Sequence, residues 1–70
     1  MNEVWTPCDK ELPKEKGEYI VTYYPCYWGH VVEDAHVGLD SFRGKTTWAK
    51  NERQKVIAWM SKPDPYKNEL

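Results

Sequence analysis

Cysteine and histidine are the side chains in this sequence that could bind a transition metal. A zinc site of the Cys₂His₂ type keeps its two cysteines two to four residues apart and closes with two histidines. Cys8 and Cys26 lie far outside that spacing, and His30 and His36 would be roughly 20 Å apart on a strand that rises ~3.3 Å per residue. The pattern therefore predicts neither a metal site nor a bound cofactor.

A second combination, Cys26, His30 and Asp34, contains the nucleophile, the base and the acid of a catalytic triad. Triads are defined by geometry, and a four-residue step along a strand would separate these groups by roughly 13 Å. The four glycines, at positions 17, 29, 38 and 44, form neither a G-x-G-x-x-G motif nor a phosphate-binding loop. We therefore expect that the protein is not an enzyme.

The segment from Pro25 to His30 carries two adjacent rings, Tyr27 and Trp28, between two predicted strands. Turns favour Gly, Pro, Asn and Asp for backbone reasons, so the turn itself does not need these rings. Two interpretations stay open: both rings face solvent and anchor a partner, or one of them folds back over the edge of the sheet. Because Tyr and Trp are enriched among residues that dominate binding energy, Tyr27 and Trp28 are candidate binding residues.

A basic segment from residue 43 to residue 55 is the second candidate surface. Its candidate binding residues are Arg43, Lys45, Trp48, Lys50 and Arg53. A tryptophan among basic side chains could bind a nucleic acid or another anionic ligand, and it could equally be a core residue. Charge is uneven along the chain: residues 1–40 hold eight acidic and three basic residues, whereas residues 43–62 hold six basic residues and one acidic residue.

Length and composition limit the fold to one small domain. The 70 residues carry a net charge of −1, and 14% of them are aromatic, so rings must fill much of the core. We predict a single β-rich domain over residues 1–70, with its core at 4–66 and a flexible tail at 67–70. The longest uncharged run, residues 19–32, is too short to span a membrane, and the charged N-terminus lacks the apolar stretch of a secretion signal. We therefore expect a cytoplasmic protein without a disulfide.

Apolar and β-branched residues predict four strands, at 18–24, 30–41, 46–50 and 55–60, with Pro25 ending the first and a bend near Glu33 in the second. An extended N-terminal strap with one helical turn near residues 8–12 precedes them, and a proline-rich C-terminal tail follows. The predicted fold class is mostly β, with a small α+β fold as the alternative: a single-domain antiparallel meander of three or four strands. The first and last strands are apolar on both faces, which predicts that they lie at the sheet centre, covered by the strap and the tail. The predicted core residues are Trp5, Val21, Tyr23, Val56, Ala58, Trp59 and Met60.

A set of residues spread over most of the chain resembles a known family. They are Trp5, Leu12, Pro13, Gly17, Val21, Trp48, Val56, Trp59, Met60, Pro63, Pro65 and Tyr66. Together they resemble the domain of unknown function 551 family, small proteins of phages, prophages and bacteria with the C-terminal signature W-M-P-L-P-x-P. Ser61 and Lys62 stand here where that family usually has Pro-Leu. The resemblance implies a compact β-rich domain in a phage-related setting, and it brings no catalytic residues.

Size, the lack of a catalytic constellation, the candidate exposed rings and this resemblance lead to one functional hypothesis. The protein is expected to be a non-enzymatic accessory module of a phage or prophage that binds a host protein, with inhibition of that protein as one outcome. The alternatives are a domain that binds nucleic acid or a small anionic ligand through residues 43–55, and a homo-oligomer that sequesters a small ligand. None of these functions involves a membrane.

Overall fold

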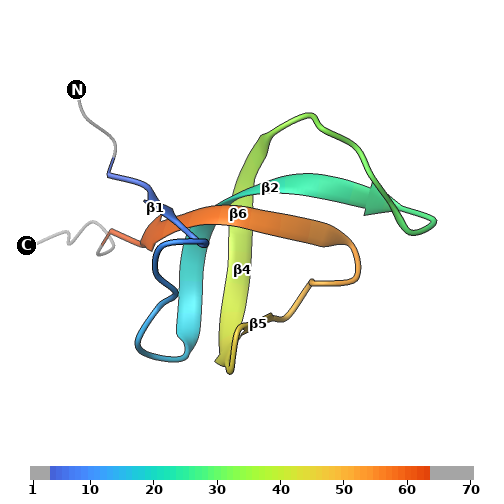
Figure 1. Cartoon of the computed structure of the whole chain (residues 1–70). Helices are drawn as coiled ribbons and strands as arrows, with labels where there is room; N and C mark the ends of the chain where they lie inside the picture. Colours follow the sequence, from blue (N-terminus) through green and yellow to red (C-terminus); the bar gives the residue numbers. More distant parts are fainter. Residues whose placement is uncertain (1–3, 64–70) are drawn as a thin grey trace, which may run out of the picture.

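The computed structural model describes residues 4–63, and all regular structure in that range is β (Figure 1). The strands are β1 (Thr6–Pro7), β2 (Gly17–Tyr27), β3 (His30–Val31), β4 (His36–Gly44), β5 (Thr47–Trp48) and β6 (Gln54–Ser61). Every strand pair is antiparallel. The mostly β, antiparallel fold predicted from the sequence is confirmed, and the described residues contain no helix of the α+β alternative.

The two middle predicted strands differ most from those in the structure. The prediction at 30–41 divides into β3 and β4, separated by residues 32–35 around the expected bend at Glu33, and the prediction at 46–50 shrinks to β5. The single turn expected near residues 8–12 is present, since the amides of Lys10 and Glu11 both donate to the Pro7 carbonyl at 3.0 and 3.1 Å.

The prediction that Pro25 ends the first strand is wrong, because β2 continues through Pro25 to Tyr27. The Pro25 carbonyl accepts the Val32 amide at 2.8 Å, so the proline nitrogen faces the same edge of β2. β4 has already left that edge, since its last pair with β2 is Tyr23 with His36. The missing N–H of Pro25 therefore costs no hydrogen bond of the main ladder.

The strand order β1-β6-β2-β4-β5 corrects the simple meander. The meander runs from β2 through β4 to β5, but β6 then crosses back and pairs with the other edge of β2 (Figure 1). The 11-residue β2 is long enough to pair along both edges, and it carries apolar side chains on both faces. Pairing β2 with β6 therefore brings the two most apolar strands together at the sheet centre, as their composition predicts.

The core is a small cluster of rings around Val21, which is fully buried. Phe42 and Trp48, at 5% and 6% exposure, complete the buried cluster with Val21. Tyr19 packs edge-on against both Trp48 and Trp59, with ring centroids 6.2 and 5.3 Å apart, and Phe42 packs edge-on against Trp48 at 5.1 Å. Edge-to-face packing of this kind contributes about 0.5–1.5 kcal/mol per pair beyond the buried area.

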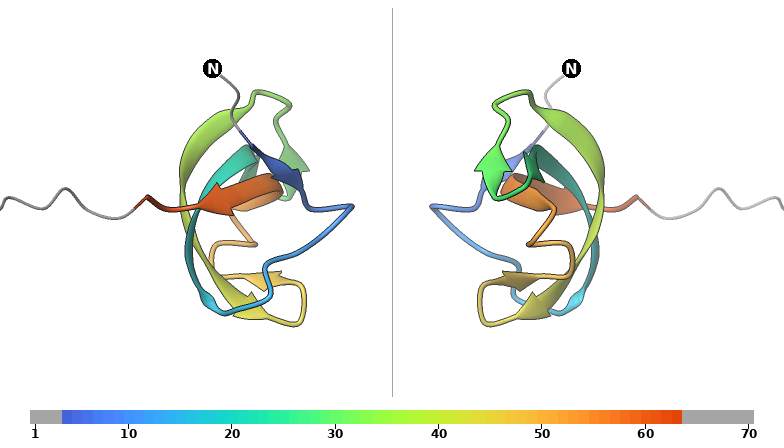
Figure 2. Two further views of the ribbon diagram at one scale, coloured as in Figure 1. Left: turned by 90° about the vertical axis from the view of Figure 1, so that its left-hand side faces the viewer. Right: turned by 90° about the vertical axis from the view of Figure 1, so that its right-hand side faces the viewer.

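All seven predicted core residues are mostly buried: Val21 fully, and Trp5, Tyr23, Val56, Ala58, Trp59 and Met60 in part. The prediction did not include Phe42 and Trp48, which join Val21 at the centre of the core, with Tyr23, Val56 and Trp59 packed against them. The reason is curvature: the sheet curls over its inner face, so the residues at the end of β4 and in β5 meet β2 (Figure 2). A thin domain of this size has little space that is far from solvent.

The N-terminal strap covers the inner face and is held by the polar ends of two core rings. The Trp59 indole Nε1 donates to the Glu11 carbonyl at 2.9 Å, and the Tyr19 hydroxyl donates to the Glu15 carbonyl at 2.8 Å. Leu12 packs against the ring cluster, and Pro13 is buried. Figure 2 shows this segment looping out from β1 and returning to the start of β2. The strap therefore covers one face of the sheet, as predicted.

The second face of the sheet carries exposed apolar side chains within residues 4–63. Leu39 and Val37 of β4 stand opposite Ile20 and Thr22 of β2 and remain 45% and 67% exposed. Ile20 and Thr22 of β2 are themselves partly buried, and the expectation that both faces of β2 are covered stays a prediction. The tail predicted to cover the second face, with Pro65, Tyr66 and residues 67–70, lies outside the described residues.

Asp40 is a buried carboxylate at 2% exposure that connects β4 to the chain between β5 and β6. Its Oδ1 accepts the amides of Ser41 at 2.8 Å and Lys50 at 3.2 Å, and its Oδ2 accepts the Gln54 side-chain amide at 3.5 Å. A buried carboxylate needs such donors, because an unpaired one would be costly to desolvate. Asp40 therefore determines how the chain enters β6.

Replacing Trp59 with alanine should lower the free energy of unfolding by about 3 kcal/mol, because the ring loses its Tyr19 contact and its hydrogen bond to the strap. Trp59→Phe keeps a ring against Tyr19 but loses the indole donor, so we expect a loss of about 1 kcal/mol. Urea denaturation followed by circular dichroism measures both. A Trp59→Ala protein with the wild-type midpoint would contradict this assignment.

The strap also carries a thiol whose ionisation depends on folding. Burial raises the pKa of Cys8, and the neighbouring Asp9 carboxylate raises it further. The unfolded chain ionises this thiol above about pH 8.5 while the folded chain still holds the proton, so stability falls as pH rises past that value. Between about pH 7.5 and 10, Cys8→Ala should therefore lose less unfolding free energy than the wild type, as measured by urea denaturation at several pH values.

Candidate functional site

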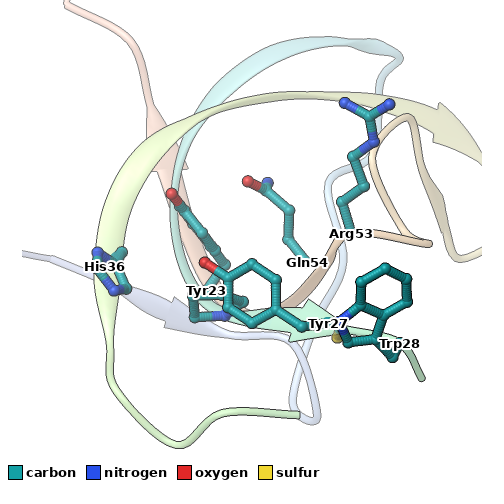
Figure 3. A pocket seen from close by; sticks show the side chains of 8 residues that line it. Tyr23, Tyr27, Trp28, His36, Arg53 and Gln54 are labelled. Atoms are coloured by element: carbon teal, nitrogen blue, oxygen red, sulfur yellow. The ribbon is translucent and has the colours of Figure 1, made fainter. Parts of the chain in front are cut away.

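A pocket of about 720 Å³ lies where β2 extends beyond its pairing with β4. It is lined by Tyr23, Pro25, Cys26, Tyr27, Trp28, His36, Arg53 and Gln54, and we call it the tip pocket. Figure 3 shows the Tyr27 ring in the foreground, with His36 and Trp28 on either side of it and Arg53 and Gln54 on a further wall. The lining residues come from β2, the turn after it, β4 and the start of β6.

The turn that carries Trp28 has an unusual residue for its backbone. Tyr27 pairs with His30, so Trp28 and Gly29 form a two-residue hairpin connection. Both have positive φ angles, 53° and 79°, which is the requirement of a type I′ turn and favours Asn-Gly. A bulky residue in this left-handed region is uncommon and costs about 1 kcal/mol or more. Trp28 also buries almost nothing, since it is 95% exposed.

The base of this turn is held on both edges. The Cys26 amide donates to the Arg53 carbonyl at 2.8 Å, and the Val32 amide donates to the Pro25 carbonyl at 2.8 Å. Pro25 itself is buried. The exposed rings of Tyr27 and Trp28 are therefore presented from an anchored hairpin.

A stacked pair forms the inner wall of the tip pocket. The rings of Tyr23 and His36, which are opposite each other on β2 and β4, lie 5.7 Å apart with an interplanar angle of 24°. Gly38 makes room for the tyrosine, because a Cβ at that position would come within 3.1 Å of the Tyr23 ring. On its outer side His36 lies close to Asp34, with Nε2 and Oδ2 3.4 Å apart. Tyr23 thus belongs both to the edge of the core and to the pocket.

Three of the site residues predicted from the sequence meet in this pocket. Tyr27 and Trp28 are 60% and 95% exposed, so the interpretation in which one ring folds back over the sheet is wrong. Arg53 lies beside them, because its carbonyl binds the Cys26 amide and its side chain lines the pocket. The structure therefore joins one residue of the basic segment to the aromatic loop.

The rest of the basic segment does not join them. Trp48 is a core residue at 6% exposure, which corrects its assignment as a binding residue. Arg43 and Lys45 lie at the far end of β4 from His36, roughly 25 Å away at ~3.3 Å per residue. The Lys50 ammonium donates to the Leu39 carbonyl at 3.2 Å. The basic residues between 43 and 55 are therefore dispersed over the surface.

Sequence reasoning missed the contribution of Pro25, Cys26, His36 and Gln54 to the pocket, and it assigned Tyr23 only to the core. Alternation along β2 contains part of the signal, since Tyr23, Pro25 and Tyr27 occupy every second position and so point to one face. His36 and Gln54 reach the same place only through the pairing of β2 with β4 and β6. No local pattern identifies that pairing.

Asp34 and Cys26, two members of the catalytic triad considered from the sequence, make other contacts in the structure. Asp34 lies beside His36 and not in a relay through His30, and the Cys26 thiol points to the Tyr24 carbonyl at 3.9 Å. Both cysteines are free thiols. Among residues 4–63, no three side chains of His, Cys, Asp or Glu gather in a way that could hold a metal ion. Within the same range, the structure contains no helix of the length and apolar character needed to cross a membrane.

Comparisons with protein-family models, with curated proteins and with solved structures find no match to this chain. The resemblance to the domain of unknown function 551 family therefore stays a prediction from the residues that carry it. The tip pocket has to be interpreted from its own geometry.

Because Tyr27 and Trp28 are exposed, replacing both with serine should leave the fold intact. We expect the free energy of unfolding to change by about 0.5 kcal/mol or less, the usual range for surface substitutions. Thermal denaturation of the Tyr27→Ser, Trp28→Ser double variant measures this. A large drop in melting temperature would mean that these rings stabilise the fold.

Proposed function

We propose that this protein is a non-enzymatic binding module that uses the tip pocket to hold a protein partner. The observation that carries the proposal is Trp28, which neither fills the core nor suits the backbone of its turn. A residue that costs local energy and buries no surface in the free protein is best explained by contact with a partner. Next to it, Tyr27 is 60% exposed, and together they provide the aromatic anchors typical of interface centres.

The dispersion of the basic residues supports a protein partner over a nucleic acid. A protein that binds nucleic acid usually aligns several cations along the phosphate backbone. Here Arg53 is the single Lys or Arg that lines the tip pocket among the described residues, and the net charge of the chain is −1. A protein interface centred on aromatic residues also depends little on salt.

The biological setting that we propose follows the resemblance to the domain of unknown function 551 family. In that setting the module is a phage or prophage accessory protein that acts in the host cytoplasm. Its partner is a host protein, and binding inhibits that protein if the tip pocket covers a functional surface.

The proposal is tested by capture of partner proteins from a lysate of the cells in which this protein occurs, followed by mass spectrometry and titration of the captured protein. Truncation of an aromatic anchor typically costs over about 2 kcal/mol of binding free energy, so the Tyr27→Ser, Trp28→Ser variant should bind the same protein roughly 30-fold more weakly or worse. Between about 50 and 200 mM salt, wild-type affinity should change little.

The matched control is Val37→Ser, Leu39→Ser, which removes two exposed apolar side chains from the opposite face of the sheet. This control should retain wild-type affinity. If the two double variants lose the partner equally, or if only the control loses it, the tip pocket is not the binding surface.

A further inference from the structure

Two of the polar side chains that line the tip pocket, Arg53 and the indole of Trp28, can only donate hydrogen bonds. The hydroxyls of Tyr23 and Tyr27 can donate or accept, and the Gln54 amide already donates to Asp40. No aspartate or glutamate side chain lines the pocket among the residues that the structure describes. This lining therefore offers hydrogen bonds to a ligand that carries acceptors, above all at Arg53 and Trp28.

Arg53 has a charge that the protein itself does not neutralise. The ion pairs in the described part of the chain are His36 with Asp34 and Lys62 with Glu18, and neither involves Arg53. Arg53 is exposed, and Figure 3 shows its guanidinium directed away from the rings of Tyr27 and Trp28. A guanidinium presents a planar fork of donors that fits one carboxylate with two hydrogen bonds. The pocket is therefore complementary to a ligand with one negative charge at Arg53.

The apolar part of the pocket consists of rings. Tyr23, Tyr27 and Trp28 present aromatic surface, and the Pro25 ring adds to it. Flat aromatic walls pack well against proline rings, whose rigid backbone loses little entropy on binding. A proline-containing segment also offers carbonyl acceptors to the donors of Arg53 and Trp28, and it lacks the N–H of each proline.

We propose that the tip pocket binds an extended segment of a partner protein in which an acidic residue is flanked by prolines. The carboxylate binds Arg53, and the proline rings pack on Tyr27 and Trp28. This inference rests on the proposed binding function and names the chemistry of the partner. A nucleic acid fits less well, because a polyphosphate would meet only one Lys or Arg in this lining.

The test uses two capped peptides of equal length, acetyl-Pro-Pro-Glu-Pro-Pro-amide and its neutral counterpart with Gln in place of Glu. Both are titrated into ¹⁵N-labelled full-length protein, and the shifts of the backbone amides and of the Trp28 indole N–H are followed by NMR. We expect the glutamate peptide to shift Trp28 and the amides around Arg53, and to bind about five- to tenfold more tightly than the glutamine peptide. In Arg53→Gln protein the two peptides should bind equally, whereas the control Arg43→Gln should preserve the preference.

Three results would overturn the inference: equal binding of both peptides to the wild type, shifts located away from the tip pocket, or no shift with either peptide. A pentathymidylate that shifts Trp28 more strongly than the glutamate peptide would also overturn it, in favour of a nucleic acid. The proposed function is tested separately by partner capture with the Tyr27→Ser, Trp28→Ser variant. If that variant loses the captured partner while Arg53→Gln retains it, the binding function stands and the acidic segment is wrong.

Discussion

The fold depends on the contact of Tyr19 in β2 with two tryptophans, Trp48 and Trp59, whose strands β5 and β6 lie on opposite flanks of β2. This contact joins β5, β2 and β6, which are far apart in sequence, and the polar ends of two of its rings hold the strap. A chain with so few aliphatic residues has no other way to fill its interior. The rings thus supply both the apolar surface of the core and the directed hydrogen bonds that close it.

The core and the tip pocket share one strand and one side-chain network. The inward row of β2 begins with Tyr19 and Val21 in the core, and after Tyr23 it continues to the pocket. Gln54 makes a second connection, because its amide binds the buried Asp40 while its side chain lines the pocket. The carboxylate at the centre of the fold therefore positions a wall of the binding site. A site built on such elements is more rigid than one built on a free loop.

Trp28 illustrates how a functional residue departs from local preference. Its backbone favours asparagine or glycine, and its ring would be better buried, yet it occupies a turn at almost full exposure. The local preference of each residue usually matches the backbone and burial of its position, and exceptions are expected at functional or strained sites. Two neighbouring residues do suit their positions. Gly29 takes the second positive φ of the turn, and Pro25 is buried at a point of β2 where its missing N–H costs no hydrogen bond of the main ladder.

The sequence alone was sufficient to predict the β class, the antiparallel strands around 18–24 and 55–60, the strap, and the aromatic pair at Tyr27 and Trp28 as a candidate site. These follow from local properties: β-branched and aromatic composition, side-chain alternation, and rings where a turn needs none. Only the tertiary structure decided that β6 pairs with β2, that Phe42 and Trp48 fill the core, and that Arg53 stands beside Trp28 while Arg43 and Lys45 stand far away. Those facts depend on strand pairing and on the curvature of the sheet, and both arise from contacts between residues that no local pattern links.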